Sequence, residues 1–279
     1  MVGKRQKKRR WPGQLMALTA VCLLLTTGNP RGTAVNSPLL QDLPEPPPAP
    51  RETAEETLLP DSVPERAPEP ESGPRYGPVP ESGAVDNEYF EDAVFLGDSR
   101  TDGFRLYSGL DTGTYLCATG ATVQSVFTKA VDTPLGKLPL LDALSRTECG
   151  KIYVMLGVNE LGWPGTDLFR EHCRELLQRI QADHPEALIM LQAILPVSAR
   201  QDARGSYVNN RRVEDYNDVL QGLAEELGVY YVAVDEPLTG EDGCLPADLN
   251  FDGVHLNPAG CAIWLDYLRT HTVVDFPVE

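Results

Sequence analysis

The sequence predicts one α/β domain, a three-layer α/β/α sandwich around a parallel sheet, over residues 84–279. Short apolar stretches alternate there with amphipathic helical patterns, which is typical of parallel strands covered by helices on both faces. Polar motifs follow several of the apolar stretches, and ligands of such sheets bind at the carboxyl ends of the strands. The proline-rich first third cannot build a core, so we expect a single folded domain.

The chain begins with a basic segment followed by an apolar one. Six of the first ten residues are Lys or Arg, and residues 14–27 (QLMALTAVCLLLTT) carry no charge. This order is typical of an export signal, and the apolar part is shorter than the roughly 20 residues that a membrane span needs. We therefore expect residues 1–27 to be a signal peptide, or a signal anchor if uncleaved. Either would place the domain outside the cytoplasm, membrane-anchored or secreted.

Residues 28–83 are predicted to be a disordered linker. The range from Pro30 to Pro80 contains 14 prolines together with many Glu, Ser and Arg residues. Proline removes backbone donors and the acidic residues repel one another, so this segment has too little apolar surface to order itself. A polyproline ligand for a partner domain is the alternative, and composition favours a plain spacer.

Five apolar stretches are predicted to be the strands of the sheet. They are residues 93–96, 114–118, 151–156, 188–195 and 229–234. Helical periodicity lies between them over residues 167–183 and 212–227, where the apolar positions fall on one face. Gly228 provides a stop for the second helix, and Pro258 can open a last helix.

Two motifs at opposite ends of the domain supply the groups of a nucleophilic hydrolase. Residues 94–100 (VFLGDSR) form an apolar run that delivers Ser99 to the end of a strand, and residues 251–256 (FDGVHL) place Asp252 three residues before His255. A serine hydroxyl becomes a good nucleophile when a base takes its proton and a third group holds that base in one tautomer. We therefore predict Ser99 as nucleophile, His255 as base and Asp252 as its orienting acid.

Two further residues between these motifs stand where oxyanion donors would be needed. Gly120 follows the second predicted strand, and Asn159 follows the third within the block Gly157-Val158-Asn159-Glu160. The four blocks together resemble those of the SGNH (GDSL-like) hydrolases, which are named for one Ser, Gly, Asn and His. The resemblance covers about residues 90–271.

The resemblance implies a flavodoxin-like α/β/α fold and an esterase of the extracytoplasmic bacterial type. It implies an oxyanion hole made by the backbone N–H groups of Ser99 and Gly120 and by the side-chain amide of Asn159. Two positions depart from the family pattern: Arg100 stands where a Leu is usual, and Glu160 where an Asp is usual.

Each of these residues also has a simpler interpretation. Gly-Asp-Ser is an ordinary turn or helix N-cap sequence, Asp252 suits an Asx turn and Asn159 a loop turn, and Gly120 a plain loop. Asp248 is a rival for the orienting acid. Arg100 and Glu160 would form an ion pair at the surface beside the cleft.

Composition excludes some classes of function. The net charge is −17, although the N-terminus is basic, so the domain is unlike a nucleic-acid-binding protein, which needs Lys and Arg for phosphates. His, Cys and acidic residues show no metal-ligand spacing, and we expect neither a metal nor a cofactor. A disulfide between Cys244 and Cys261 is conceivable after export.

The sequence therefore predicts a serine esterase that hydrolyses acyl groups, with O-acetyl groups first, on cell-wall or other polysaccharides or on small-molecule esters. The membrane would be a partner only through an uncleaved N-terminal segment. Two alternatives remain: an O-acyltransferase that uses the same acyl-serine, and a non-catalytic wall-associated binding module.

Overall fold

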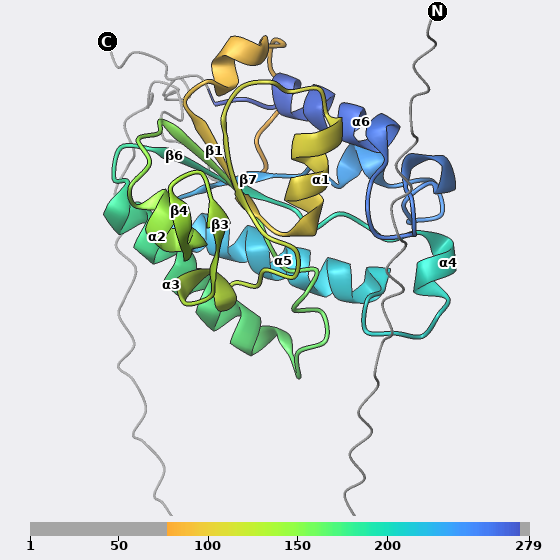
Figure 1. Ribbon diagram of the computed structural model, residues 1–279. Coiled ribbons are helices and arrows are strands. Elements are labelled where there is room, and N and C mark those ends of the chain that lie inside the picture. The colour runs from red at the N-terminus through yellow and green to blue at the C-terminus, as the bar shows by residue number, and fades with distance from the viewer. Residues whose placement is uncertain (1–76, 274–279) are drawn as a thin grey trace, which may run out of the picture. The chain divides into compact units, whose positions relative to one another are not determined.

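The computed structural model describes residues 77–273, and every structural statement below concerns that range (Figure 1). The predicted signal segment and most of the predicted linker lie outside the described residues. In the described range no helix is long and apolar enough to cross a membrane.

A five-stranded parallel sheet forms the middle layer. Its order is β2-β1-β5-β6-β7, and its bounds are β1 Ala93–Gly97, β2 Thr114–Cys117, β5 Lys151–Met155, β6 Leu188–Gln192 and β7 Tyr230–Val232. From β1 the chain moves to β2 on one side and then crosses to β5 on the other. The carboxyl ends of β1 and β5 therefore flank the point where the strand order reverses, which is where ligands bind in such sheets.

Helices cover both faces of the sheet (Figure 1). Helix α1 (Ser99–Tyr107) and helix α6 (Pro258–Thr270) lie on one face, and α3 (Thr166–Asp183) and α5 (Asn210–Leu227) lie on the other. Two short helices, α2 (Leu140–Leu144) and α4 (Ala199–Asp202), lie in connections. The predicted three-layer fold is confirmed.

The ends of the long helices follow from local chemistry. Asn209 caps α5 by accepting a hydrogen bond from Arg212 N, and Gly228 ends that helix with a φ of +65°, as its sequence predicts. At α6, Asn257 is the N-cap and Pro258 occupies the first turn, where a missing N–H costs nothing.

The structure differs from the sequence prediction mainly in the lengths of the strands and in the presence of a hairpin. Ala193, Ile194 and Leu195 are buried but lie beyond the end of β6. The predicted strand is too long because an apolar run in the sequence indicates burial and does not indicate which residues pair with a neighbouring strand. An antiparallel hairpin of β3 (Ala130–Thr133) and β4 (Gly136–Pro139) was not predicted. None of its residues is fully buried, so no clear apolar pattern in the sequence indicates it.

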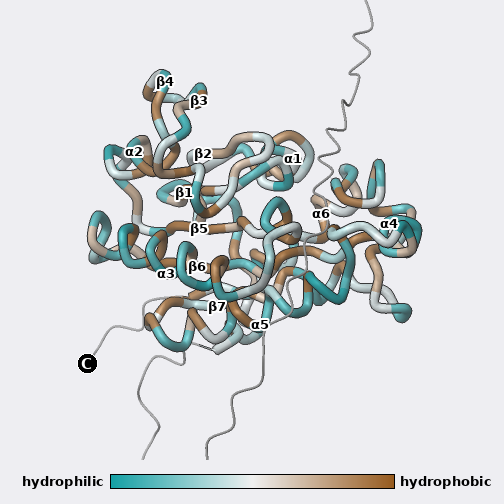
Figure 2. Tube along the Cα trace, turned by 90° about the horizontal axis from the view of Figure 1, so that it is seen from below, coloured by the Kyte–Doolittle hydropathy of each residue, from teal (hydrophilic) through white to brown (hydrophobic). Residues whose placement is uncertain are grey.

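The core lies between the sheet and the helices. Phe95 at the centre of β1 stacks on Tyr115 and Tyr153 of the neighbouring strands, with ring centroids 4.9 and 5.0 Å apart. On the α1/α6 face, Phe104 packs against Trp264 at 4.5 Å. Figure 2 shows hydrophobic residues along the central strands and hydrophilic ones on the outer helix surfaces. This packing fixes β1, and with it the start of α1.

The boundary expected at residue 84 is too late. Val79 is buried and donates its backbone N–H to Tyr231 O at 2.8 Å, and Pro78 forms a parallel bridge with the same residue of β7. Ser82 N donates to Thr270 O at 2.6 Å. An apolar side chain and backbone bonds thus tie residues 78–82 to the domain. The remainder of the predicted linker lies outside the described range.

The five cysteines of the described range are all free. They are Cys117, Cys149, Cys173, Cys244 and Cys261. The bridge considered between Cys244 and Cys261 is absent: the Cys261 thiol lies 3.7 Å from Gly103 O, and Cys244 Sγ lies 3.3 Å from the Asn210 side chain.

Candidate active site

The turn from β1 into α1 presents Ser99 at the carboxyl edge of the sheet. Asp98 is the N-cap of α1, and its Oδ1 accepts a hydrogen bond from Arg100 N at 2.8 Å. Gly97 lets the helix start close to the strand, because a Cβ there would lie 2.0 Å from Thr101 Oγ1 and 2.7 Å from Met155 O. The first two residues of the Gly-Asp-Ser motif thus have structural tasks, and Ser99 is the first residue of the helix.

A tight loop between residues 250 and 256 carries the acid and the histidine. Phe251 N donates to His255 O at 2.9 Å, and Gly253 N donates to the Asn250 side chain at 2.7 Å. Asp252 Oδ1 accepts from the backbone N–H groups of Val254 and His255, both at 2.9 Å. Asp252 therefore forms the Asx-type turn that its simpler interpretation predicts, and its second oxygen stays available for the imidazole.

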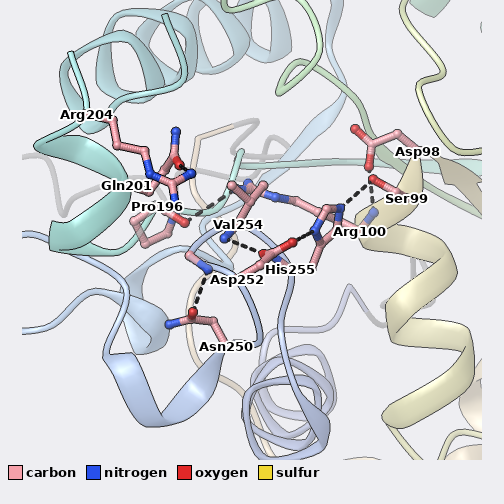
Figure 3. A network of polar contacts seen from close by, with 11 residues as sticks. Asp98, Ser99, Arg100, Pro196, Gln201, Arg204, Asn250, Asp252, Val254 and His255 are labelled. Carbon is pink, nitrogen blue, oxygen red and sulfur yellow. Dashed lines mark hydrogen bonds and ion pairs between the residues drawn. The ribbon is translucent and has the colours of Figure 1, made fainter. Parts of the chain in front are cut away.

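Ser99, His255 and Asp252 form one hydrogen-bonded chain. Ser99 Oγ lies 3.0 Å from His255 Nε2, and His255 Nδ1 lies 2.8 Å from Asp252 Oδ2. Figure 3 shows Ser99 at one side of the imidazole and Asp252 at the other. An ionised carboxylate can only accept, so the Asp252 contact places the ring proton on Nδ1 and leaves Nε2 as an acceptor for the serine hydroxyl.

The local hydrogen bonds keep Asp252 charged. Partial burial acts to raise its pKa, but the hydrogen bonds from the backbone and ring of His255 and from Val254 N outweigh it, and the pKa of Asp252 is lowered. The side chains of His255 and Asp252 are 42% and 56% exposed. The site is therefore open to solvent on this side. Asp248, the rival acid, is not the partner of the histidine.

The two predicted oxyanion donors follow β2 and β5. The end of β2 is joined to β1 where Ala118 N donates to Gly97 O at 3.2 Å, and Gly120 follows on an exposed loop with a φ of +74°. That left-handed conformation favours glycine. Asn159 Nδ2 donates to Ala121 O at 2.8 Å and to Asp98 Oδ2 at 3.2 Å. Its amide therefore lies beside the residue that precedes Ser99.

The surface ion pair expected between Arg100 and Glu160 is wrong, because both side chains are buried. Arg100 Nη1 donates to Leu195 O at 2.6 Å, and Nη2 reaches Pro196 O at 3.5 Å. Burial lowers the pKa of Arg100 to about 10, against the opposing charges of Asp98 and Asp252. Glu160 Oε1 instead accepts a hydrogen bond from Val123 N at 2.6 Å.

The connection between β6 and α5, residues 193–209, contacts both motifs and was missed from the sequence. Its carbonyls at 195 and 196 accept from Arg100, beside Ser99. Ser198 N donates to Gly253 O at 2.9 Å, in the histidine loop. The backbone of this connection thus contacts the motif that contains Ser99 and the loop that contains His255, and it fixes their relative position. Only the buried apolar residues 193–195 beyond β6 could have indicated it.

Asp98, the residue before Ser99, is a buried carboxyl with a shifted pKa. It is buried, and burial raises its pKa to about 6 although the Arg100 N–H and guanidinium act to lower it.

Within residues 77–273, no group of three or more His, Cys, Asp or Glu residues is placed to hold a metal ion. The chemistry available at this edge of the sheet is that of a serine, an imidazole and hydrogen-bond donors.

The fold and this geometry define an α/β/α protein with a Ser–His–Asp chain at the switch point of its sheet. Residues 95–263 match the GDSL-like lipase/acylhydrolase family, and the chain belongs to that family. The resemblance seen in the sequence is thereby confirmed. The family consists of hydrolases that act on esters, so the chain is an ester hydrolase by class.

Two solved structures illustrate the likeness. One, from Streptococcus pneumonia and described as a candidate platelet activating factor, is 23% identical, with a TM-score of 0.51 over 64% of this chain and 82% of that one. A GDSL-like lipase from Bacteroides thetaiotaomicron is 15% identical, with a TM-score of 0.48 over 63% and 84%. At 23% identity the likeness to the first structure concerns the fold alone. None of the curated proteins matches the chain.

Proposed function

We propose that the protein is a serine esterase in which Ser99 is the nucleophile, His255 the general base and Asp252 the residue that orients it. The observation that carries the proposal is the continuous chain of hydrogen bonds in which Ser99 meets His255, 156 positions away, at 3.0 Å and His255 meets Asp252 at 2.8 Å.

The geometry supports acyl transfer in two steps. Ser99 Oγ attacks the ester carbonyl while its proton moves to His255 Nε2, and Asp252 stabilises the imidazolium that forms. His255 then gives this proton to the leaving alcohol, and an acyl-serine remains. A water molecule attacks the acyl-serine with His255 again as base, which releases the acid and restores Ser99.

The oxyanion would be stabilised by backbone N–H groups of Ser99 and Gly120 and by the Asn159 amide. The start of α1 adds the positive end of the helix dipole at Ser99. Loss of one preorganised donor typically costs about 2.7–4 kcal/mol of transition-state stabilisation. The Gly120 loop and the Asn159 loop must therefore keep a fixed distance from Ser99.

The substrate we propose is an O-acetyl group on a cell-wall or other polysaccharide. Two observations support a polymeric substrate outside the cytoplasm: the exposure of the histidine and its acid, and the export-type N-terminus followed by a long Pro/Glu-rich segment. A reporter that is active only outside the cytoplasm, fused after Glu279, should be active. A fusion active only in the cytoplasm would overturn this location.

The proposal is tested on a panel of p-nitrophenyl esters and acetylated polysaccharides, with wild type beside Ser99→Ala. The wild type should hydrolyse acetyl esters, and Ser99→Ala should not. A fluorophosphonate probe should label the wild type at Ser99. Failure to label would favour the binding-module alternative, and acylated sugar formed from an ester donor and a sugar acceptor would identify a transferase.

A further inference from the structure

Glu160 is a buried carboxyl between the loops that carry the proposed oxyanion donors. Its side chain is 0% exposed. Oε1 accepts one hydrogen bond, from the uncharged backbone N–H of Val123 at 2.6 Å, and Oε2 has no partner within the described residues. The charged group that acts on it is a like charge, the carboxyl of Asp98. Only neutral backbone N–H groups, those of Val123, Glu160 and Asn159, act in favour of a negative charge on Glu160, and burial outweighs them.

The backbone of Glu160 is fixed on several sides. Its N–H donates to Gly157 O at 3.1 Å, and its carbonyl accepts from Trp163 N at 2.8 Å and from the Tyr216 hydroxyl at 2.7 Å. Tyr216 belongs to α5, so the residue is anchored to the helix layer beneath β5. The backbone of Glu160 is therefore fixed against α5, and its side chain extends from there to the loop after β2.

That loop is the one that bears Gly120. Val123 N, held by Glu160, lies three residues after Gly120, and Ala121 O, held by Asn159, lies one residue after it. Asn159 and Glu160, which are consecutive in the block of residues 157–160, thus hold the same loop at two points. The direction of the Gly120 N–H depends on both contacts.

We propose that Glu160 is a positioning residue of the oxyanion hole, and that it holds the Gly120 loop in place only as the uncharged acid. An ionised carboxylate buried among neutral backbone donors, with no cation beside it, is far more costly than a neutral acid with an unpaired hydroxyl. Ionisation would also add a negative charge to the residue that follows Asn159, one of the proposed oxyanion donors. Both effects oppose catalysis.

The titration of Glu160 falls in an accessible pH range. Burial raises its pKa to about 8, the backbone N–H groups of Val123, Glu160 and Asn159 act against this rise, and the Asp98 carboxyl adds to it. The other titratable groups that face it are Cys173 on α3 and Tyr216 on α5, whose own pKa values are raised chiefly by burial. The guanidinium of Arg212 on α5 is directed at the carbonyls of Leu161 and Trp163.

The test rests on the proposed esterase activity and compares kcat and KM for p-nitrophenyl acetate from about pH 6 to about pH 10. Wild-type kcat should fall with a midpoint near pH 8. Glu160→Gln, which cannot ionise, should stay within about threefold of wild-type kcat at neutral pH and lose the alkaline fall. Glu160→Ala should lower kcat by about tenfold or more and KM much less.

Asp235→Asn is the matched control. Asp235 is a partly buried acid with an unpartnered Oδ1, and burial raises its pKa to about 6, but it follows β7 at the far edge of the sheet. Its profile should keep the alkaline fall. An equal alkaline fall in Glu160→Gln, or a flat wild-type profile, would overturn the proposal.

The NMR signal of the Val123 amide provides a readout that does not need turnover. It should shift with a midpoint near pH 8 in the wild type and stay constant in Glu160→Gln. A signal that does not titrate in the wild type would also overturn the proposal. If neither protein hydrolyses any ester while the Val123 signal titrates, the proposed function fails and the assignment of Glu160 as the uncharged acid stands.

Discussion

The side-chain amide of Asn159 donates a hydrogen bond to Asp98 Oδ2 over 3.2 Å, which joins the residue before Ser99 to the proposed oxyanion donor. The same Nδ2 donates to Ala121 O at 2.8 Å. An amide group has two hydrogens, so both are engaged before substrate binds. An oxyanion must therefore compete for the longer bond, the one to Asp98, while the bond to Ala121 keeps the amide in place.

The first prediction concerns this amide. Asn159→Ala should lower kcat about a hundredfold or more while KM changes little, because the contact is strongest in the transition state. Steady-state kinetics on an acetyl ester measure both. Asn217→Ala is the control: Asn217 holds the backbone of Ile194 from α5, so its loss should lower Tm and leave kcat within a few-fold. A change in KM alone would move Asn159 from catalysis to binding.

The second prediction concerns the triad as a unit. Ser99→Ala and His255→Ala should each abolish ester hydrolysis with the fold intact, as circular dichroism can check. Because the two residues perform one proton transfer, the double variant should be little slower than either single one. His271→Ala, at the end of α6, should hydrolyse like the wild type. Undiminished turnover by Ser99→Ala would end the serine mechanism.

The third prediction concerns the close approach of α1 to the sheet. Gly97→Ala should destabilise the domain by about 1–3 kcal/mol, because the added methyl overlaps Thr101 Oγ1 and Met155 O. Adding Thr101→Ala should recover part of this loss, because it removes the 2.0 Å overlap with Oγ1 and leaves Met155 O and the Cβ of residue 101, each at 2.7 Å. Denaturant unfolding of the two variants measures the difference. Equal stability of Gly97→Ala and wild type would show that the helix start can shift freely.

The fourth prediction concerns stability and pH at Glu160. Its folded pKa of about 8 is above the ordinary 4.5, so between these values the unfolded chain loses the proton first and the free energy of unfolding falls as pH rises. The slope is at most about 1.4 kcal/mol per pH unit. Glu160→Gln lacks this dependence, so its Tm minus the wild-type Tm should increase from acidic pH to about pH 8 and then level off. A constant difference contradicts the assignment.

The fifth prediction concerns the start of the domain. A truncated protein that begins at Ala84 should melt roughly 5 °C or more below one that begins at Gly77, because it loses the burial of Val79 and the backbone bonds of Val79 and Ser82. Proteins that begin at Val35 and at Gly77 should melt together, since proline and glutamate supply no core. Val79→Ala should account for part of the loss. Equal melting of the first pair would make residues 77–83 dispensable.

The sequence predicted the parts of the site that local chemistry encodes. Asp252 and His255 meet because they are three positions apart in a tight loop. Ser99 follows a strand that its apolar run alone was enough to predict. The alternation of strands and helices was enough to place Ser99, Gly120 and Asn159 at one edge of the sheet. Their roles in catalysis stay predictions.

The rest depends on contacts between distant segments of backbone. Arg100 is buried because the carbonyls of residues 195 and 196 accept its hydrogens, and no pattern in either segment announces the other. Glu160 is buried for the same kind of reason, through the amide of Val123. Charged residues are expected at the surface, so Arg100 and Glu160 were predicted to be exposed. Both are buried because backbone groups of distant segments hydrogen-bond to their side chains.

The short pairing of Pro78 and Val79 with β7 has a consequence for the behaviour of the protein in concentrated solution. Strand β7 is an outer strand of the sheet, and an uncovered outer strand is a template on which another chain can add. The preceding segment occupies part of that template. The prolines at 78 and 80 have no N–H to offer to a further strand, so they end the ladder on this side. The N-terminal end of the domain therefore also protects it against self-association.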